Sequence, residues 1–217
     1  MHQSKSRRLL LLATIVAALV VIFDQILKFY IKTHFYLGED VEVLSFFHIR
    51  FIQNNGMAFG IELGSKLFLT LFRIILVCFL GWYIARLAKL ARVPAGDMVA
   101  VALVASGAFG NIIDCVAYGE IFSNPYPPEV AAIVPWGSGY GGLFHGLVVD
   151  MLYFPLFSFT WPEWMPLCGG RVFSFFDPVF NIADAAITIG MGMIIFFYAK
   201  YLGSEYIKNE QDKGKKA

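Results

Sequence analysis

Four long apolar stretches dominate the pattern of hydrophobic and polar positions along the chain. They lie at about residues 9–30, 66–87, 97–117 and 178–201. A helix of about 20 predominantly apolar residues crosses the hydrocarbon core of a bilayer. The pattern therefore predicts an all-α membrane protein with four transmembrane helices, built as a single membrane domain over residues 1–217.

Two segments between these stretches, about 32–65 and 118–177, are more polar. Residues 41–53 are rich in β-branched and aromatic residues with partial alternation, which is typical of a strand. An Asn-Asn-Gly turn then leads into residues 57–60, predicted as a second strand of a small extracytoplasmic β-sheet. The second segment carries many prolines and aromatic residues, and is predicted to be a long aromatic outer loop at the level of the lipid headgroups.

The composition agrees with a membrane protein. Hydrophobic residues make up 58% of the chain, against roughly 45–50% in soluble domains. The net charge is only +1, and no basic face remains once the helices are assigned, so nucleic acid is excluded as a partner. The three cysteines lack metal-ligand spacing. We expect free thiols, with a Cys115–Cys168 bridge as the alternative.

The basic residues are distributed unevenly along the chain. Eleven of the seventeen lie before the first stretch, from residue 86 to residue 97, or from residue 200 onward, together with only four acidic residues. Because short cytoplasmic segments of membrane proteins are enriched in Lys and Arg, both termini are predicted to be cytoplasmic. The segments 32–65 and 118–177 then face outward.

Carboxylates lie inside or next to the apolar stretches. Asp24 and Asp114 are near the outer ends of the first and third, and Asp184 is about two turns into the fourth. Asp150 follows an apolar run in the outer segment. A charged residue within a span costs about 2.5–3.5 kcal/mol on insertion scales and often marks a functional site. Asp24, Asp114 and Asp184 could converge, because their places in the spans give them comparable depths. Two carboxylates that share a proton can act as base and acid on one water.

Structural roles compete with this interpretation. Lys28 lies one turn beyond Asp24, so these two can form an ion pair that only stabilises the fold. Asn111 lies three residues before Asp114, and the two can form a polar clasp between helices. Asn181 stands in the same relation to the aspartate of the fourth stretch. The residues alone leave structure and chemistry both open.

Five motifs in chain order resemble those of one protein family. They are Asp24-Gln25-x-x-Lys28, Asn54-Asn55-Gly56-Met57-Ala58-Phe59-Gly60, Gly107-Ala108-Phe109-Gly110-Asn111-Ile112-Ile113-Asp114, Val148-Val149-Asp150 and Phe180-Asn181-Ile182-Ala183-Asp184. The family is the lipoprotein signal peptidases (signal peptidase II), membrane aspartyl proteases of four helices with a small outer β-sheet.

The resemblance implies that Asp150 and Asp184 are the catalytic pair. It implies supporting or substrate-binding roles for Asp24, Lys28, Asn54, Gly56, Asn111, Asp114 and Asn181. The implied substrate is a diacylglyceryl-modified prolipoprotein, cleaved just before the lipidated cysteine. The implied location is the bacterial cytoplasmic (inner) membrane, with the active site near its outer face. We expect a monomer in contact with membrane lipid, with no metal and no cofactor.

The chain departs from the family pattern in two places. The family usually has Arg directly after the aspartate of the third helix, whereas this chain has Cys115, which leaves the partner of Asp114 open. The connection from that aspartate to the Val-Val-Asp motif is usually short, whereas residues 115–149 intervene here. We expect this insertion to restrict or cap the site.

Two other classes of function compete with the peptidase. Buried acids also line proton paths, so a proton-coupled small transporter or channel is one alternative. The lack of inverted repeats and broken helices counts against it. A non-catalytic membrane interaction protein, in which the polar residues only clasp helices, is the other.

Overall fold

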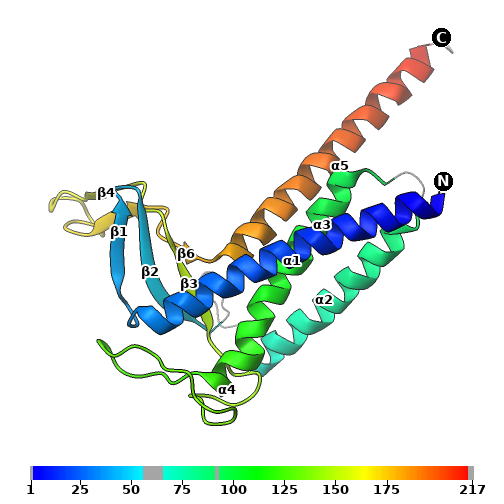
Figure 1. Ribbon diagram of the computed structural model, residues 1–217. Coiled ribbons are helices and arrows are strands. Elements are labelled where there is room, and N and C mark those ends of the chain that lie inside the picture. Colours follow the sequence, from blue (N-terminus) through cyan, green and yellow to red (C-terminus); the bar gives the residue numbers. More distant parts are fainter. Residues whose placement is uncertain (1, 56–65, 91–92, 215–217) are drawn as a thin grey trace. The chain divides into compact units, whose positions relative to one another are not determined.

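The structure, a computed structural model, describes residues 2–55, 66–90 and 93–214 (Figure 1). Within these residues, four helices are long and apolar enough to cross a membrane. They are α1 (His2–His34), α2 (Lys66–Ala88), α3 (Ala95–Ile113) and α5 (Ile182–Gly214). The four predicted apolar helices are therefore confirmed.

The third apolar helix continues beyond α3 through a distorted turn. The π-helical turn η1 (Asp114–Tyr118) follows α3 directly, and the short α4 (Gly119–Ile121) completes the segment. A π turn inserts an extra residue into a helix and often occurs at a functional site. Here it begins at Asp114 and has three buried residues, Asp114, Cys115 and Tyr118.

Within the described part of the chain, six strands form two small antiparallel sheets. The larger sheet has the order β1-β2-β3-β6. Its strands are β1 (Asp40–Leu44), β2 (Phe47–Asn54), β3 (Val148–Tyr153) and β6 (Val179–Phe180). The smaller sheet is a hairpin of β4 (Phe157–Thr160) and β5 (Val172–Phe175).

The strands differ from the prediction in several ways. The single strand expected at 41–53 is a hairpin, because a turn at Ser45 and Phe46 separates β1 from β2. The second strand expected at 57–60 lies outside the described residues. The segment 118–177, expected as a loop, contains β3, β4 and β5. The described part of the chain is mostly helical with two small sheets, so the predicted all-α class is correct only for the helical part.

The last helix starts later than predicted. α5 begins at Ile182, whereas the apolar pattern placed its start near residue 178. Residues 179–180 belong instead to β6, which pairs with β3. Asp184 therefore lies in the first turn of α5 and not about two turns into it.

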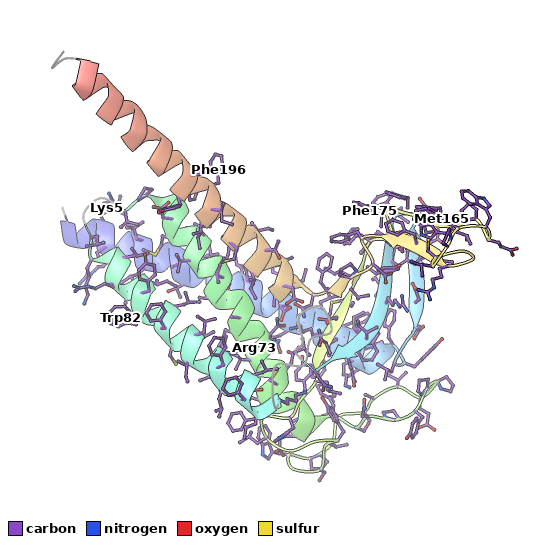
Figure 2. All side chains as sticks on the ribbon, turned by 180° about the vertical axis from the view of Figure 1, so that it is seen from behind. Lys5, Arg73, Trp82, Met165, Phe175 and Phe196 are labelled. Carbon is purple, nitrogen blue, oxygen red and sulfur yellow. The ribbon has the colours of Figure 1, made fainter. Side chains whose placement is uncertain are left out.

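The chain divides into two compact units, and each is described by itself. The first unit comprises Met1–Ile22, Ile74–Gly110 and Ala183–Ala217. Its α3 and α5 pack closely, because a Cβ at Gly190 would lie only 2.7 Å from the carbonyl oxygen of Ala100. Many apolar side chains of α2 point outward, such as Trp82, which is 60% exposed (Figure 2).

The second unit comprises Phe23–Arg73 and Asn111–Ile182. Its hydrophobic core joins the last turns of α1 to the larger sheet and to η1 and α4. The buried members are Ile31, Phe51, Tyr118, Phe122, Val149 and Met151. Among the candidate site residues that the structure describes, all except Asp184 fall within this second unit. The prediction of one membrane domain stays a prediction.

Candidate active site

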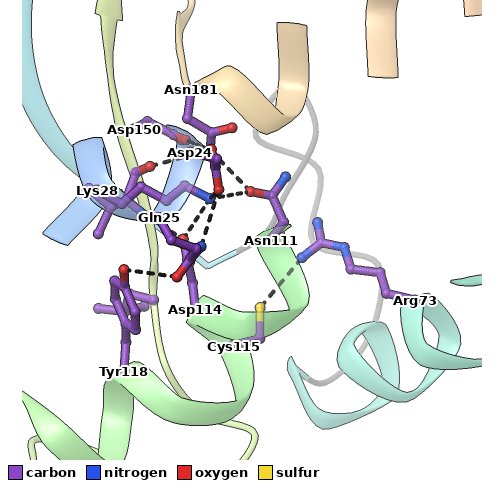
Figure 3. Close-up of polar contacts among 12 residues, drawn as sticks. Asp24, Gln25, Lys28, Arg73, Asn111, Asp114, Cys115, Tyr118, Asp150 and Asn181 are labelled. Carbon is purple, nitrogen blue, oxygen red and sulfur yellow. Dashed lines mark hydrogen bonds and ion pairs between the residues drawn. The ribbon is translucent and has the colours of Figure 1, made fainter. Parts of the chain in front are cut away.

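Lys28 is the centre of a buried polar cluster in the second unit (Figure 3). Its Nζ donates to Asp24 Oδ2 at 2.8 Å, to Asp114 Oδ2 at 2.9 Å and to Asn111 Oδ1 at 2.8 Å. An ammonium group has three protons, so each of them has an acceptor here. Lys28, Asp24 and Asp114 are all 0% exposed. The lysine thus compensates two carboxylates that would be costly to bury alone.

Asp114 receives two further hydrogen bonds. Gln25 Nε2 donates to its Oδ1 at 3.0 Å, and the backbone N–H of Val149 donates to its Oδ2 at 3.2 Å. The hydroxyl of Tyr118 in turn donates to Gln25 Oε1 at 3.2 Å. These bonds connect η1 to α1 and to β3. Asp114, which no Arg follows in this chain, is thus paired with Lys28 and accepts further hydrogen bonds from Gln25 and Val149.

Asp150 is held by an asparagine from a distant part of the chain. It is 1% exposed and lies on β3, opposite Ile52 of β2. Asn181 Nδ2 donates to Asp150 Oδ1 at 2.7 Å. The same nitrogen lies 3.1 Å from Asn111 Oδ1, which also accepts from Lys28. A continuous hydrogen-bond chain therefore runs from Lys28 through Asn111 and Asn181 to Asp150.

The structure thus brings together most of the predicted site residues. Those in direct contact through the cluster are Asp24, Lys28, Asn111, Asp114, Asp150 and Asn181. Asn54 ends β2 and pairs with Val148, two residues before Asp150. Gly56 lies outside the described residues. Asp184 belongs to the other unit, so its pairing with Asp150 stays a prediction.

The structural roles considered for two pairs of these residues are also present. Asp24 and Lys28 form the predicted i, i+4 ion pair on α1. Asn111 and Asp114 share the ammonium of Lys28, which ties α3 and η1 to α1. Gln25 and Tyr118 were not predicted as site residues. Gln25 could have been predicted as a site residue, because it stands beside Asp24 in the first motif. Tyr118 could not, because only the tertiary structure brings its hydroxyl to Gln25.

Cys115 has a cationic neighbour on another helix. It is 1% exposed, and Arg73 Nη1 of α2 lies 3.6 Å from its Sγ (Figure 3). A guanidinium therefore lies beside the residue that follows Asp114, although it does not come from the next position in sequence. Cys78, Cys115 and Cys168 are free thiols in the structure, as expected.

The inserted segment closes on itself. The N–H of Gly146 donates to Cys115 O at 2.9 Å, and the N–H of Gly141 donates to Gly119 O at 2.9 Å. A Cβ at Gly119 would lie 2.9 Å from Gly141 O, so glycine is required for this close approach. Because the segment leaves and returns at one point, Asp114 stays next to Val149. The predicted capping role of the segment stays a prediction.

A second buried lysine contacts the inserted segment. Lys32 is 1% exposed, and its Nζ lies 4.9 Å from the ring centre of Tyr140, 5.7 Å from that of Phe51 and 6.0 Å from that of Phe122. The Tyr140 oxygen accepts the N–H of Leu147 at 2.6 Å. Burial of Tyr140 raises the pKa of its hydroxyl to about 12.

Comparison with known proteins identifies the family. The family described as Signal peptidase (SPase) II matches residues 16–200. The chain belongs to the signal peptidase II family. Within the described residues, no group of three or more His, Cys, Asp and Glu side chains could hold a metal ion.

Relatives of known name agree with this assignment. The lipoprotein signal peptidase of Porphyromonas gingivalis is 44% identical, over 86% of this chain and 83% of its own length. That of Amoebophilus asiaticus is 36% identical, over 83% of this chain and 74% of its own. A solved bacterial membrane enzyme, obtained by the in meso method at 2.3 Å resolution, is 30% identical with a TM-score of 0.60, and 87% of each chain is covered. The transporter alternative finds no support among these relatives.

Proposed function

We propose that this chain is a membrane aspartic endopeptidase that removes the signal peptide from diacylglyceryl-modified prolipoproteins. Cleavage falls just before the lipidated cysteine. The relatives bear the name lipoprotein signal peptidase. The observation that carries the proposal is the buried carboxylate of Asp150, held at 2.7 Å by Asn181.

The position of Asn181 in the chain supports Asp184 as the second catalytic carboxylate. Asn181 directly precedes α5, and Asp184 lies in the first turn of that helix. Three residues of extended chain span at most about 11 Å. The side chain that holds Asp150 is thus tethered close to Asp184.

The proposed mechanism uses the two aspartates as a proton-sharing pair. The ionised carboxylate removes a proton from a bound water, and the oxygen of that water attacks the carbonyl carbon before the lipidated cysteine. The protonated carboxyl donates to the carbonyl oxygen as the carbon becomes tetrahedral. The proton taken from water then passes to the nitrogen of the cysteine as the C–N bond breaks, and a hydroxyl of the tetrahedral carbon returns its proton to the carboxylate that had donated one. Asn181 orients Asp150 for this exchange.

The remaining cluster supports the pair without taking part in bond cleavage. Lys28, with Asp24 and Asp114, fixes the side chain of Asn111, and Asn111 fixes Asn181. A catalytic group works only when its rotamer is held by such neighbours. Asn54 and Gly56, at and beyond the end of β2, are proposed as supporting or substrate-binding residues.

We further propose that the protein acts as a monomer in the bacterial inner membrane, in contact with its lipids. Both termini lie in the cytoplasm and the active site lies near the outer face. The enrichment of Lys and Arg in the first turns of α1, around the connection from α2 to α3 and along the end of α5 supports this orientation.

The test is cleavage of a diacylglyceryl-modified prolipoprotein by the purified full-length protein in detergent. Mass spectrometry of the product should show the lipidated cysteine as the new N-terminus. Asp150→Asn and Asp184→Asn should each lower kcat by at least about 100-fold, because each removes one proton-transfer group. Asp97→Asn, in the first turn of α3, is the matched control and should keep most of the activity.

Two outcomes would overturn the proposal. Full activity in either Asp150→Asn or Asp184→Asn would exclude the catalytic pair. Proton flux into liposomes without any cleavage of the precursor would instead favour transport. Circular dichroism and the elution volume of each variant in detergent show whether a loss of activity reflects misfolding.

A further inference from the structure

The β4–β5 hairpin has one aromatic face and one mainly polar face. Its register pairs Phe157 with Phe175 and Phe159 with Phe173, and it pairs Ser158 with Ser174. Because successive side chains of a strand point to opposite sides, all four phenylalanines lie on one face. The two serines lie on the other.

The phenylalanine face packs on itself but stays open to its surroundings. The rings of Phe157 and Phe175 stack at 4.9 Å, and those of Phe159 and Phe173 lie 5.2 Å apart. The four side chains nevertheless remain 39–52% exposed. An isolated two-stranded hairpin is at best marginally stable in water, so this face is expected to meet an apolar surrounding.

The tip of the hairpin presents two more apolar side chains. Trp164 is 80% exposed and Leu167 is 96% exposed. Backbone hydrogen bonds order the tip, with Met165 N–H donating to Pro162 O and Gly169 N–H to Met165 O. Leu167 has a φ of 72°, which is uncommon for a residue with a side chain. The fold therefore holds an exposed leucine in a strained conformation.

The size and charge of this surface limit its partner. Four half-exposed phenylalanines offer on the order of 400 Å², whereas a stable protein dimer buries about 800 Å² on each partner. The only charged residues from 156 to 176 are Glu163 and Arg171, of opposite sign. Neither a second copy of the chain nor a charged molecule fits such a surface well.

A lipid surface fits it better. The same unit contains the end of α1, which forms part of a candidate membrane span and exposes Phe23, Ile26 and Tyr30. Strands of four residues extend about 13 Å, too short to cross a core of about 30 Å. An amphipathic element of this length with Trp near its tip is typical of the membrane interface.

We propose that the β4–β5 hairpin lies in the membrane interface, with its phenylalanine face and the Trp164–Leu167 tip among the lipid chains. The leaflet is the one that the His34 end of α1 reaches. The hairpin then anchors the larger sheet, which is joined to it through the residues between β3 and β4, to the membrane surface. This inference does not depend on the peptidase activity.

Site-directed spin labelling tests the proposal. The background carries Cys78→Ser and Cys168→Ser, and the buried Cys115 is retained because it is only 1% exposed. A nitroxide is attached at Phe159→Cys on the aromatic face or at Thr160→Cys, its neighbour on the polar face. Ile26→Cys on α1 is the lipid-facing reference. The full-length protein is placed in lipid nanodiscs that hold one copy each.

The expected result is a clear difference between the two faces. The label at 159 should collide with oxygen, which concentrates in lipid, to the same extent as the label at 26. The label at 160 should shift toward collision with a water-soluble nickel complex. Equal nickel accessibility at 159 and 160 would overturn the proposal. Shielding at 159 that develops only when a lipidated peptide is added, or only when two copies share a disc, would overturn it as well.

A second pair of labels avoids the interior of the hairpin, in case Phe159→Cys does not fold. Leu167→Cys at the tip replaces a side chain that is 96% exposed, and Ser158→Cys is its polar-face control. The tip label should match the reference at 26, and nickel accessibility at 167 equal to that at 158 would contradict the proposal.

Discussion

Two buried lysines lie one turn apart on α1 and are compensated in different ways. Lys28 is surrounded by two carboxylates and an amide oxygen. Lys32 lies among three aromatic rings, with Asn124 Oδ1 at 3.4 Å. Among the described residues, no carboxylate lies within ion-pair distance of Lys32. The ammonium of Lys28 is thus neutralised by carboxylates, whereas that of Lys32 is stabilised by cation–π contacts.

The difference separates two tasks of the same helix. Lys28 organises the polar cluster that orients Asp150. Loss of the Lys28 ammonium would leave the buried carboxylates of Asp24 and Asp114 without their cation. Lys32 contacts Tyr140 and Phe122, which lie at the two ends of the inserted segment. Its loss leaves only rings and an amide, none of which is charged. The same change at the two positions should therefore have unequal effects.

The largest effect is expected for Lys28→Met. The variant keeps Asp24 and Asp114 fully buried without the ammonium that lies between them. Breaking a buried pair by removing one partner costs about 3–5 kcal/mol. We expect a large drop in the unfolding temperature in detergent, measured by intrinsic fluorescence, and loss of precursor cleavage.

The double variant Lys28→Met with Asp24→Asn is the control for stranded charge. It removes one of the two carboxylates together with the lysine, so it should unfold at a higher temperature than Lys28→Met alone. If the single variant unfolds like the unsubstituted protein, the cluster does not depend on the lysine charge.

A smaller effect is expected for Lys32→Met. The substitution removes the cation but keeps an apolar side chain of similar length, and cation–π contacts are worth about 0.5–2 kcal/mol. Hydrogen exchange should become faster in residues 122–147, while kcat for precursor cleavage changes little. A loss of stability as large as that of Lys28→Met would show that the two lysines do the same work.

The smallest effect concerns Tyr140 and appears only at alkaline pH. Its pKa is about 12 in the folded protein, against 10.0 ordinarily, because the hydroxyl is buried. The unfolded chain therefore releases this proton at a lower pH than the folded chain does. The contribution of this hydroxyl to folding stability is therefore fully present below about pH 10 and is lost as the pH rises toward 12.

Comparison with Tyr140→Phe isolates this contribution. Unfolding temperatures of both proteins are measured from pH 8 to about pH 12 in detergent. The gap between them should narrow above pH 10, since only the unsubstituted protein loses stability through this hydroxyl. A gap that stays constant over the whole range would contradict the role assigned to the buried hydroxyl.

Much of the fold and part of the site could be predicted from local pattern. Apolar runs of about 20 residues specified the four helices. The spacing of Asp24 and Lys28 specified an ion pair, because residues four apart face each other on a helix. The strands were harder to predict. Residues 41–53 contain a turn that the partial alternation concealed, and β3 becomes a strand only by pairing with β2 and β6.

The sequence by itself thus determined the helices, the membrane class and the chemistry available along α1. Only the tertiary structure decided which distant groups meet. Asn181 reaches Asp150 across 31 residues, and Arg73 reaches Cys115 across 42. It also decided that the inserted segment returns to its starting point, so that Asp114 still meets Val149. The physical reason is that helix spacing is set by neighbours along the chain, whereas a buried polar group takes whichever partner the packing of distant segments brings within hydrogen-bond distance.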